Sequence, residues 1–199
     1  MVSLPVIAVT MGDPCGIGPE VVAKALIQEE VHRVCLPLVV GNSDVMKEVA
    51  VLVQPGLQVR EITDPRDIDP SRETITVLDP HNLNPKDIRI GVVSGAAGKA
   101  SMEWAELAAR LCLNGTVQAM ATAPLNKESL KAAGVPHIDH TAVLRERAEE
   151  RKAMTLFVVK DLRIFFLTRH ISFREIADAI TKESIVEAVP LCDLYLRQL

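Results

Sequence analysis

The sequence predicts an α/β fold, an α/β/α sandwich built around a mixed sheet. Short apolar runs rich in branched residues alternate with helical patterns along most of the chain, as in strands connected by helices. Two further apolar runs, 154–159 and 162–168, flank Lys160-Asp161 and predict an antiparallel hairpin. Aromatic residues make up only 3% of the 199 residues, so aliphatic side chains must fill the core.

Five strands are expected before the hairpin. The run 5–11 is short, branched and continuously apolar, which is typical of a strand covered on both faces. Pro37 lacks a backbone N–H, which weakens the strand around it or puts that strand at an edge. The strands are expected at 5–11, 34–41, 57–62, 74–79 and 117–123.

Helices are predicted where apolar residues recur with helical spacing next to start or stop signals. Pro19 opens the first helix, and Gly115 lies where the helix 94–115 should end. Ser172 and Glu175 form a capping box for a helix over 173–180. The other helices are expected at 43–51 with Ser43 as cap, from Lys127 to Gly134, from His140, and from a Thr181 cap to residue 199.

The last predicted helix carries an apolar stripe that runs unbroken to residue 199. Such a stripe needs a partner surface. That surface belongs to this chain, to a second copy or to a further segment, and the sequence leaves the three open.

Composition excludes several classes of protein. The formal net charge is −4, and no run is rich in Lys and Arg, so a nucleic-acid partner is not expected. No apolar run approaches the ~18 residues of a membrane span. The four cysteines are far apart and form no CxxC, which predicts reduced, mostly buried thiols in a cytoplasmic protein.

Two glycine-rich stretches do not match nucleotide motifs. "SGAAGKAS" has Ala100 in place of the Ser or Thr of a phosphate loop, and "GDPCGIGPE" has Val21 in place of the third glycine of a dinucleotide fingerprint. The second stretch still offers bare backbone before a helix, which suits an anion or a closely packed ligand. A tight turn with glycines serving only backbone geometry is the alternative.

Two histidines lie where α/β proteins place ligands. His170 follows a very apolar strand at a strand-to-helix corner, and His140 precedes Thr141 at the start of a helix. A lone histidine at either place is more often a surface or capping residue.

Four ordered stretches, "TMGDPCGIGPEVVAKAL", "VSGAAGKAS", "ATAPLNKESLKAAGVPHIDHTAVL" and "LTRHISFREIADAIT", resemble the motifs of the 4-hydroxythreonine-4-phosphate dehydrogenase family. The resemblance covers about residues 5 to 182. It implies a fold like the isocitrate and isopropylmalate dehydrogenases, with two lobes, a cleft between them and a homodimer. In this chain the lobes would be 1–135 and 136–199, the second incomplete because family members continue further.

The resemblance also implies a reaction and its site residues. The reaction is NAD-dependent oxidation of a phosphorylated hydroxy acid, assisted by a divalent metal (Zn, Mg or Co) and followed by decarboxylation. His140 and Thr141 match residues that contact substrate, and His170 matches the first metal-binding histidine. Lys127 lies in a motif close to the cleft.

Several alternatives stay open. Asp139 and Ala142 stand where the family usually has Gly and Glu, so another sugar-acid phosphate or an aromatic dihydrodiol is a possible substrate. Two more metal-binding histidines are expected beyond residue 199, so these 199 residues alone are predicted to turn over poorly or not at all. A non-catalytic binding or assembly module is the alternative from another class. An enzyme of the isopropylmalate type proper is weaker, because no suitable pair of aspartates is evident.

Overall fold

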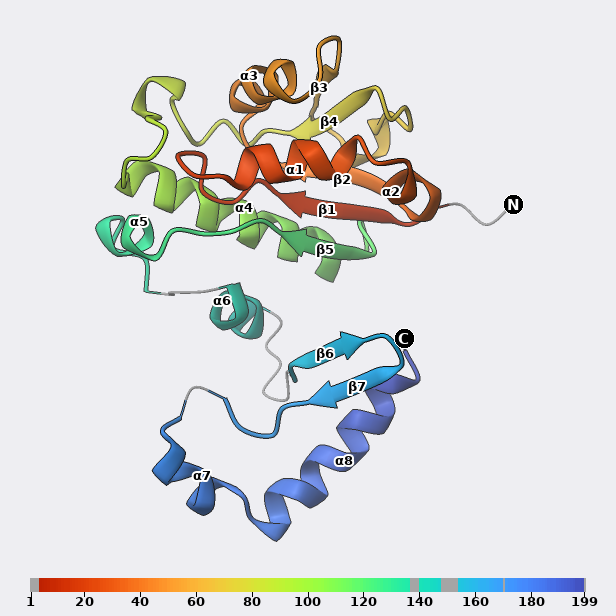
Figure 1. Cartoon of the computed structure of the whole chain (residues 1–199), viewed down its shortest axis with the longest axis vertical. Coiled ribbons are helices and arrows are strands. Elements are labelled where there is room, and N and C mark those ends of the chain that lie inside the picture. The colour runs from red at the N-terminus through yellow and green to blue at the C-terminus, as the bar shows by residue number, and fades with distance from the viewer. Residues whose placement is uncertain (1–3, 137–139, 148–153, 170, 199) are drawn as a thin grey trace. The chain divides into compact units, whose positions relative to one another are not determined.

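The computed structural model describes residues 4–136, 140–147, 154–169 and 171–198. Contacts divide the chain into two compact units, Met1–Glu149 and Glu150–Leu199. Figure 1 shows the elements of each unit. Helix α6 (His140–Arg147) groups with the first unit. The division into family-type lobes at residue 135 stays a prediction.

The first unit is built on a five-stranded sheet in which every pair of neighbours is parallel. The strand order is β3-β4-β2-β1-β5. Among the described residues, the expected mixed sheet is instead a parallel sheet and a separate antiparallel hairpin. The strands are β1 (Val6–Thr10), β2 (Leu36–Val40), β3 (Gln58–Ile62), β4 (Thr74–Leu78) and β5 (Ala119–Thr122).

Strand β2 lies inside the sheet, so the expectation of an edge strand is wrong. The N–H of Leu36 donates to the carbonyl of Pro5 on the β1 side, so the nitrogen of Pro37 faces the β4 side. Pairing with β4 begins only at Val39. The missing N–H of Pro37 therefore interrupts no ladder.

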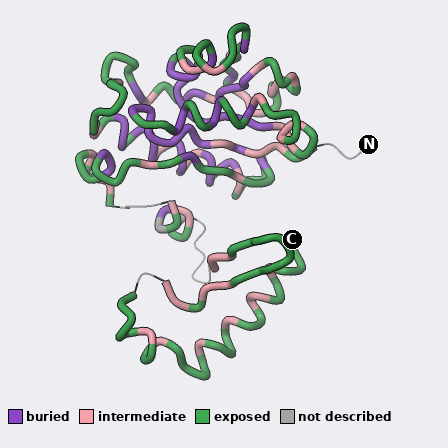
Figure 2. The backbone as a smooth tube through the Cα atoms, in the orientation of Figure 1, coloured by how far each residue is buried: buried purple, intermediate pink, exposed green. Residues whose placement is uncertain are grey.

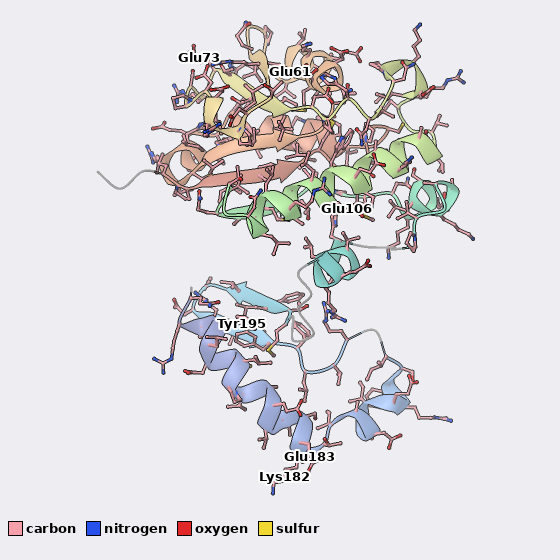
Figure 3. All side chains as sticks on the ribbon, turned by 180° about the vertical axis from the view of Figure 1, so that it is seen from behind. Glu61, Glu73, Glu106, Lys182, Glu183 and Tyr195 are labelled. Carbon is pink, nitrogen blue, oxygen red and sulfur yellow. The ribbon has the colours of Figure 1, made fainter. Side chains whose placement is uncertain are left out.

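Helices cover both faces of the parallel sheet, which confirms the predicted α/β/α layering. α1 and α3 contact each other on one face, whereas α4 contacts β1, β2 and β5 from the opposite face (Figures 1 and 3). Asn42, not Ser43, caps α3, because its side chain accepts from the N–H of Val45. The helices of this unit are α1 (Gly18–Leu26), α2 (Glu29–Val34), which the sequence patterns did not predict, α3 (Ser43–Val53), α4 (Gly95–Leu113), α5 (Lys127–Ala132) and α6, with short 3₁₀ turns η1 (Pro65–Asp67) and η2 (Pro85–Asp87).

The core of the first unit is aliphatic except for one aromatic residue. Figure 2 shows the buried backbone concentrated in the parallel sheet and the helices that cover it. Trp104 of α4 is fully buried, and its indole N–H donates to Asn82 Oδ1 at 2.9 Å. A second apolar cluster joins Met102 and Ala105 of α4 to Leu130 of α5 and Val143 of α6.

The second unit consists of a hairpin and two helices. Strands β6 (Leu156–Val159) and β7 (Leu162–Phe165) pair antiparallel, as predicted. The N–H of Ser172 donates to Glu175 Oε2 at 2.8 Å, which confirms the capping box of α7 (Phe173–Ala179). Thr181 caps α8 (Lys182–Leu196) by accepting from the N–H of Ser184. The apolar stripe of α8 is exposed at Ile185, Val189 and Leu196.

Candidate functional site

The carboxyl ends of the five parallel strands lie level with one another. Thr10 pairs with both Val40 and Thr122, and Leu78 pairs with both Val40 and Ile62. The chain leaves β1 through α1 toward β2, whereas it reaches β5 through α4 on the other face, so the connections reverse between β1 and β5. α/β proteins bind ligands outside the carboxyl ends of the strands at such a switch point.

Two loops meet at this switch point. The N–H of Asp13, after β1, donates to the carbonyl of Pro124, after β5, at 3.0 Å. Gly12 has φ +75°, and a Cβ there would lie 2.4 Å from the carbonyl oxygen of Pro124. The glycine-rich loop is therefore a tight turn, and its backbone at Gly12 and Asp13 packs against the backbone of Pro124.

The carboxylate of Asp13 is buried, with 3% of the residue exposed. Its Oδ1 accepts from the N–H of Cys15 at 2.8 Å, and its Oδ2 accepts from Ser129 Oγ at 2.9 Å. Burial raises the pKa of the Cys15 thiol; a hydrogen bond from the backbone of Arg89 opposes this, and the charge of Asp13 adds to it. Cys15 is thus a thiol at neutral pH, unlike a nucleophilic cysteine.

Lys127 is the first residue of α5, three positions after Pro124. Asn126 caps this helix, because its Oδ1 accepts from the N–H groups of Glu128 and Ser129 at 2.9 and 3.0 Å. The cap fixes the start of the helix beside the β5 carboxyl end. Lys127 is exposed there, so its ammonium group can reach an anion at this edge.

His140 and Thr141 begin α6, with His140 half-buried and Thr141 exposed. One turn further along, Val143 is buried against α4 and against Leu130 of α5. Packing therefore brings together the two helices that carry Lys127 and the His140-Thr141 pair.

His170 lies outside the described residues, as does Asp139. Within the described ranges no group of three or more His, Cys, Asp or Glu side chains has a geometry suited to a metal ion. Close to position 170 in sequence, a cavity of about 420 Å³ is lined by Thr155, Phe157, Phe166, Thr168 and Arg169.

A second polar cluster, at the carboxyl ends of β2, β3 and β4, was not predicted. Asp79 accepts from the N–H groups of Ser43 and His81 at 2.8 and 2.7 Å. Glu61 accepts from Ser43 Oγ at 2.5 Å and lies 3.1 Å from His81 Nε2. The contacts between these segments span 18 to 36 residues, so no local pattern marks them, although Asp79-Pro80 is a turn signal.

Sequence reasoning also missed Asp13 and Ser129 as individual residues. The available signal was the Gly-Asp-Pro turn, since Asp favours turns that its own side chain closes. Nothing local marks Ser129 as its partner, which lies 116 residues away.

A parallel sheet with helices on both faces and polar side chains at its switch point is the architecture of α/β proteins that bind ligands at that edge. Residues 33–199 match the family model of "Pyridoxal phosphate biosynthetic protein PdxA". The chain belongs to this family.

Relatives and solved structures agree with this assignment. The chain is 39% identical over 195 residues to a Halalkalibacterium halodurans protein named "Putative D-threonate 4-phosphate dehydrogenase", covering 98% of this chain and 58% of the relative. A 4-hydroxythreonine-4-phosphate dehydrogenase from Klebsiella pneumoniae has a TM-score of 0.88 at 33% identity, over 98% of this chain and 59% of that one. A terephthalate 1,2-cis-dihydrodiol dehydrogenase from Burkholderia xenovorans has a TM-score of 0.67 at 25% identity, over 94% and 55%. The chain thus spans less than two thirds of the length of these proteins.

The thiols and the helices show two further features. All four cysteines are free thiols, as predicted, although only Cys15 is fully buried. Among the described residues, no helix combines the length and the apolar character that crossing a membrane requires.

Proposed function

We propose that the chain is part of an NAD-dependent, divalent-metal-assisted dehydrogenase of a phosphorylated hydroxy acid such as 4-phosphohydroxy-L-threonine. The observation that carries the proposal is the 39% identity over 195 residues to a relative named for such an activity. The packing of α5 and α6 on α4 supports it, because it holds Lys127, His140 and Thr141 on adjoining helices.

The reaction removes a hydride from a secondary alcohol carbon and a proton from its oxygen. The hydride would go to NAD and the proton to solvent, and the β-keto acid formed would lose its carboxylate as carbon dioxide and take up a proton at the carbon left behind. His140 and Thr141 would donate hydrogen bonds to the anionic substrate, and Lys127 would offer its ammonium to the phosphate.

The metal part of the proposal rests on the resemblance alone. The described residues do not form a metal site, so the ion (Zn, Mg or Co) would require His170 together with donors from outside the described ranges. A cytoplasmic homodimer is also proposed. The four free thiols support the compartment, and the exposed apolar residues Val186, Val189 and Leu194 of α8 support association.

The relatives favour a phosphorylated substrate. The phosphate-named relatives are 39% and 33% identical to the chain, whereas the dihydrodiol dehydrogenase is 25% identical. The experiment uses both 4-phosphohydroxy-L-threonine and D-threonate 4-phosphate, in order to decide which of the two is the substrate.

A binding or assembly module is the second candidate function. The exposed apolar residues Val186, Val189 and Leu194 of α8, which offer a surface for a partner, favour it. Such a module would bind ligand at the β1/β5 edge without turnover.

The test is NADH absorbance after mixing the chain with NAD, Mg²⁺ or Zn²⁺ and each phosphorylated acid in turn, alongside calorimetric binding of the same acids. NADH formation supports the dehydrogenase. If the acids bind, but neither this chain nor a longer product of the same gene forms NADH, the result supports the module. If the chain shows no binding and no turnover, both candidate functions are rejected.

A further inference from the structure

We propose that Asp13 and Ser129 are positioning residues that set the placement of the substrate-binding side chains on α5 and α6. The inference rests on the proposed function, because it gives Lys127 and His140 a ligand to meet. Neither Asp13 nor Ser129 needs to touch that ligand.

The two residues form a buried, directed chain of hydrogen bonds. Ser129 is fully buried, and its Oγ donates to Asp13 Oδ2 at 2.9 Å. The same Oγ accepts from the N–H of Ser94, the cap residue of α4, at 3.4 Å. A carboxylate only accepts, so the hydroxyl proton of Ser129 must point to Asp13. These hydrogen bonds therefore join three segments, the β1–α1 loop, the start of α4 and the helix α5, and the direction of each bond is fixed.

The hydrogen bonds of Asp13 and Ser129 lie next to the residues that would bind substrate. Lys127 is two positions before Ser129 in α5. Leu130 is one position after it and packs with Val143 of α6, which is one turn beyond His140. Because protein interiors are close-packed, a small shift of α5 at Ser129 is passed to both helices.

The backbone of α5 packs closely on α4 at this point, so a shift of α5 is not absorbed locally. A Cβ on Gly98 would lie 2.2 Å from the carbonyl oxygen of Ser129, so α4 and α5 touch backbone to backbone. The loops are already joined by the Asp13 N–H to the Pro124 carbonyl. A side-chain hydrogen bond through the Asp13 carboxylate is therefore not needed to hold the loops together, and burying a carboxylate costs free energy unless it is well hydrogen-bonded. A role in fixing the position of α5 accounts for a carboxylate at this place.

The experiment measures calorimetric affinity for 4-phosphohydroxy-L-threonine, below the melting temperature of every variant. Ser129→Ala removes the donor. Asp13→Asn puts an amide N–H in the place of one carboxylate oxygen, so the Ser129 hydroxyl loses its acceptor or must turn to accept a hydrogen bond. Ser101→Ala is the matched control, because Ser101 is an equally buried serine of α4 whose Oγ donates to the Gly98 carbonyl at 2.8 Å. Lys127→Met provides the background for a double-mutant cycle.

Ser129→Ala is expected to weaken binding about fivefold to tenfold, whereas Ser101→Ala lowers the melting temperature and leaves affinity unchanged. In the Lys127→Met background, Ser129→Ala should cost less than it does alone, because the part of its effect that acts through Lys127 is already lost. Unchanged affinity in Ser129→Ala, with a clear loss in Lys127→Met, overturns the inference and leaves the proposed function standing. Absence of binding by the unaltered chain overturns both. If Asp13→Asn does not fold, the Ser129 cycle decides alone.

Discussion

The backbone of Gly12 approaches Pro124 so closely that a Cβ at position 12 would lie 2.4 Å from the Pro124 carbonyl oxygen. This contact joins the β1–α1 loop to the β5–α5 loop at the switch point of the sheet. Because Gly12 also has φ +75°, a side chain there meets two separate penalties. The glycine is therefore required by the site as well as by the turn.

Gly12→Ala is expected to destabilise the protein through both penalties. The left-handed conformation costs about 1–2 kcal/mol for a residue with a Cβ, and overpacking adds about 1–3 kcal/mol. Urea unfolding followed by circular dichroism measures the sum. Gly56→Ala is the matched control, because Gly56 has φ +92° and no atom within 4 Å of its Cβ position. Equal losses in the two variants would show that the contact with Pro124 is not tight.

The bond between Trp104 and Asn82 supports a second prediction. Asn82→Ala leaves the buried indole N–H without its acceptor, which costs about 1–3 kcal/mol. Unfolding followed by Trp fluorescence measures the loss, since Trp104 is the sole tryptophan. In a Trp104→Phe background, monitored by circular dichroism, Asn82→Ala should be much milder. A loss of the same size in both backgrounds would assign it to other contacts of Asn82, such as the one with Glu103.

The order of strands and helices was predictable because it depends on local patterns. The apolar run 5–11 became β1, and Ser172 with Glu175 capped α7 as expected. The failures at α2 and at the Asn42 cap were local, whereas the failure at Pro37 depended on contacts with a distant segment. Pro37 indicated an edge strand, yet the ladder that it would interrupt starts only at Val39.

The candidate site residues His140, Thr141 and Lys127 come from motifs that are local in sequence, and their roles stay predictions. The hydrogen bond from Ser129 to Asp13 crosses 116 residues and depends on the packing of α4 against α5, which no periodicity encodes. The position predicted for a metal ligand, His170, lies outside the described residues, so that assignment stays a prediction.

The pair Asp64–Arg66 predicts a dependence of stability on acid pH. Side-chain and backbone hydrogen bonds from Arg66 lower the pKa of Asp64 from 3.8 to about 2. A lowered carboxyl pKa in the folded state adds stability above the unfolded value, and this stability is lost as pH falls through the folded value. The effect is small, since Arg66 is exposed and Asp64 is only half-buried, so solvent screens the pair.

Asp64→Asn is therefore expected to lower the urea midpoint slightly above pH 3.8, with the difference from the unaltered chain disappearing toward pH 2. Midpoints at a series of pH values measure this. In an Arg66→Gln background the pH-dependent effect should be smaller, because only the backbone hydrogen bond from residue 66 to Asp64 remains. A difference that persists below pH 2 would separate the acid sensitivity from this pair.

Thr141 offers the most direct test of substrate contact at α6. Its side chain is exposed at the start of the helix, so Thr141→Val should leave folding nearly unchanged. If the hydroxyl donates to an anionic substrate, its loss removes about 1.5–3 kcal/mol of binding, which weakens affinity about tenfold or more. Calorimetric titration with 4-phosphohydroxy-L-threonine measures the change. Thr116→Val is the control, since Thr116 is an exposed threonine in the loop before β5. Equal affinities of the two variants and the unaltered chain would remove Thr141 from the binding site and leave His140 and Lys127 as its remaining described candidates.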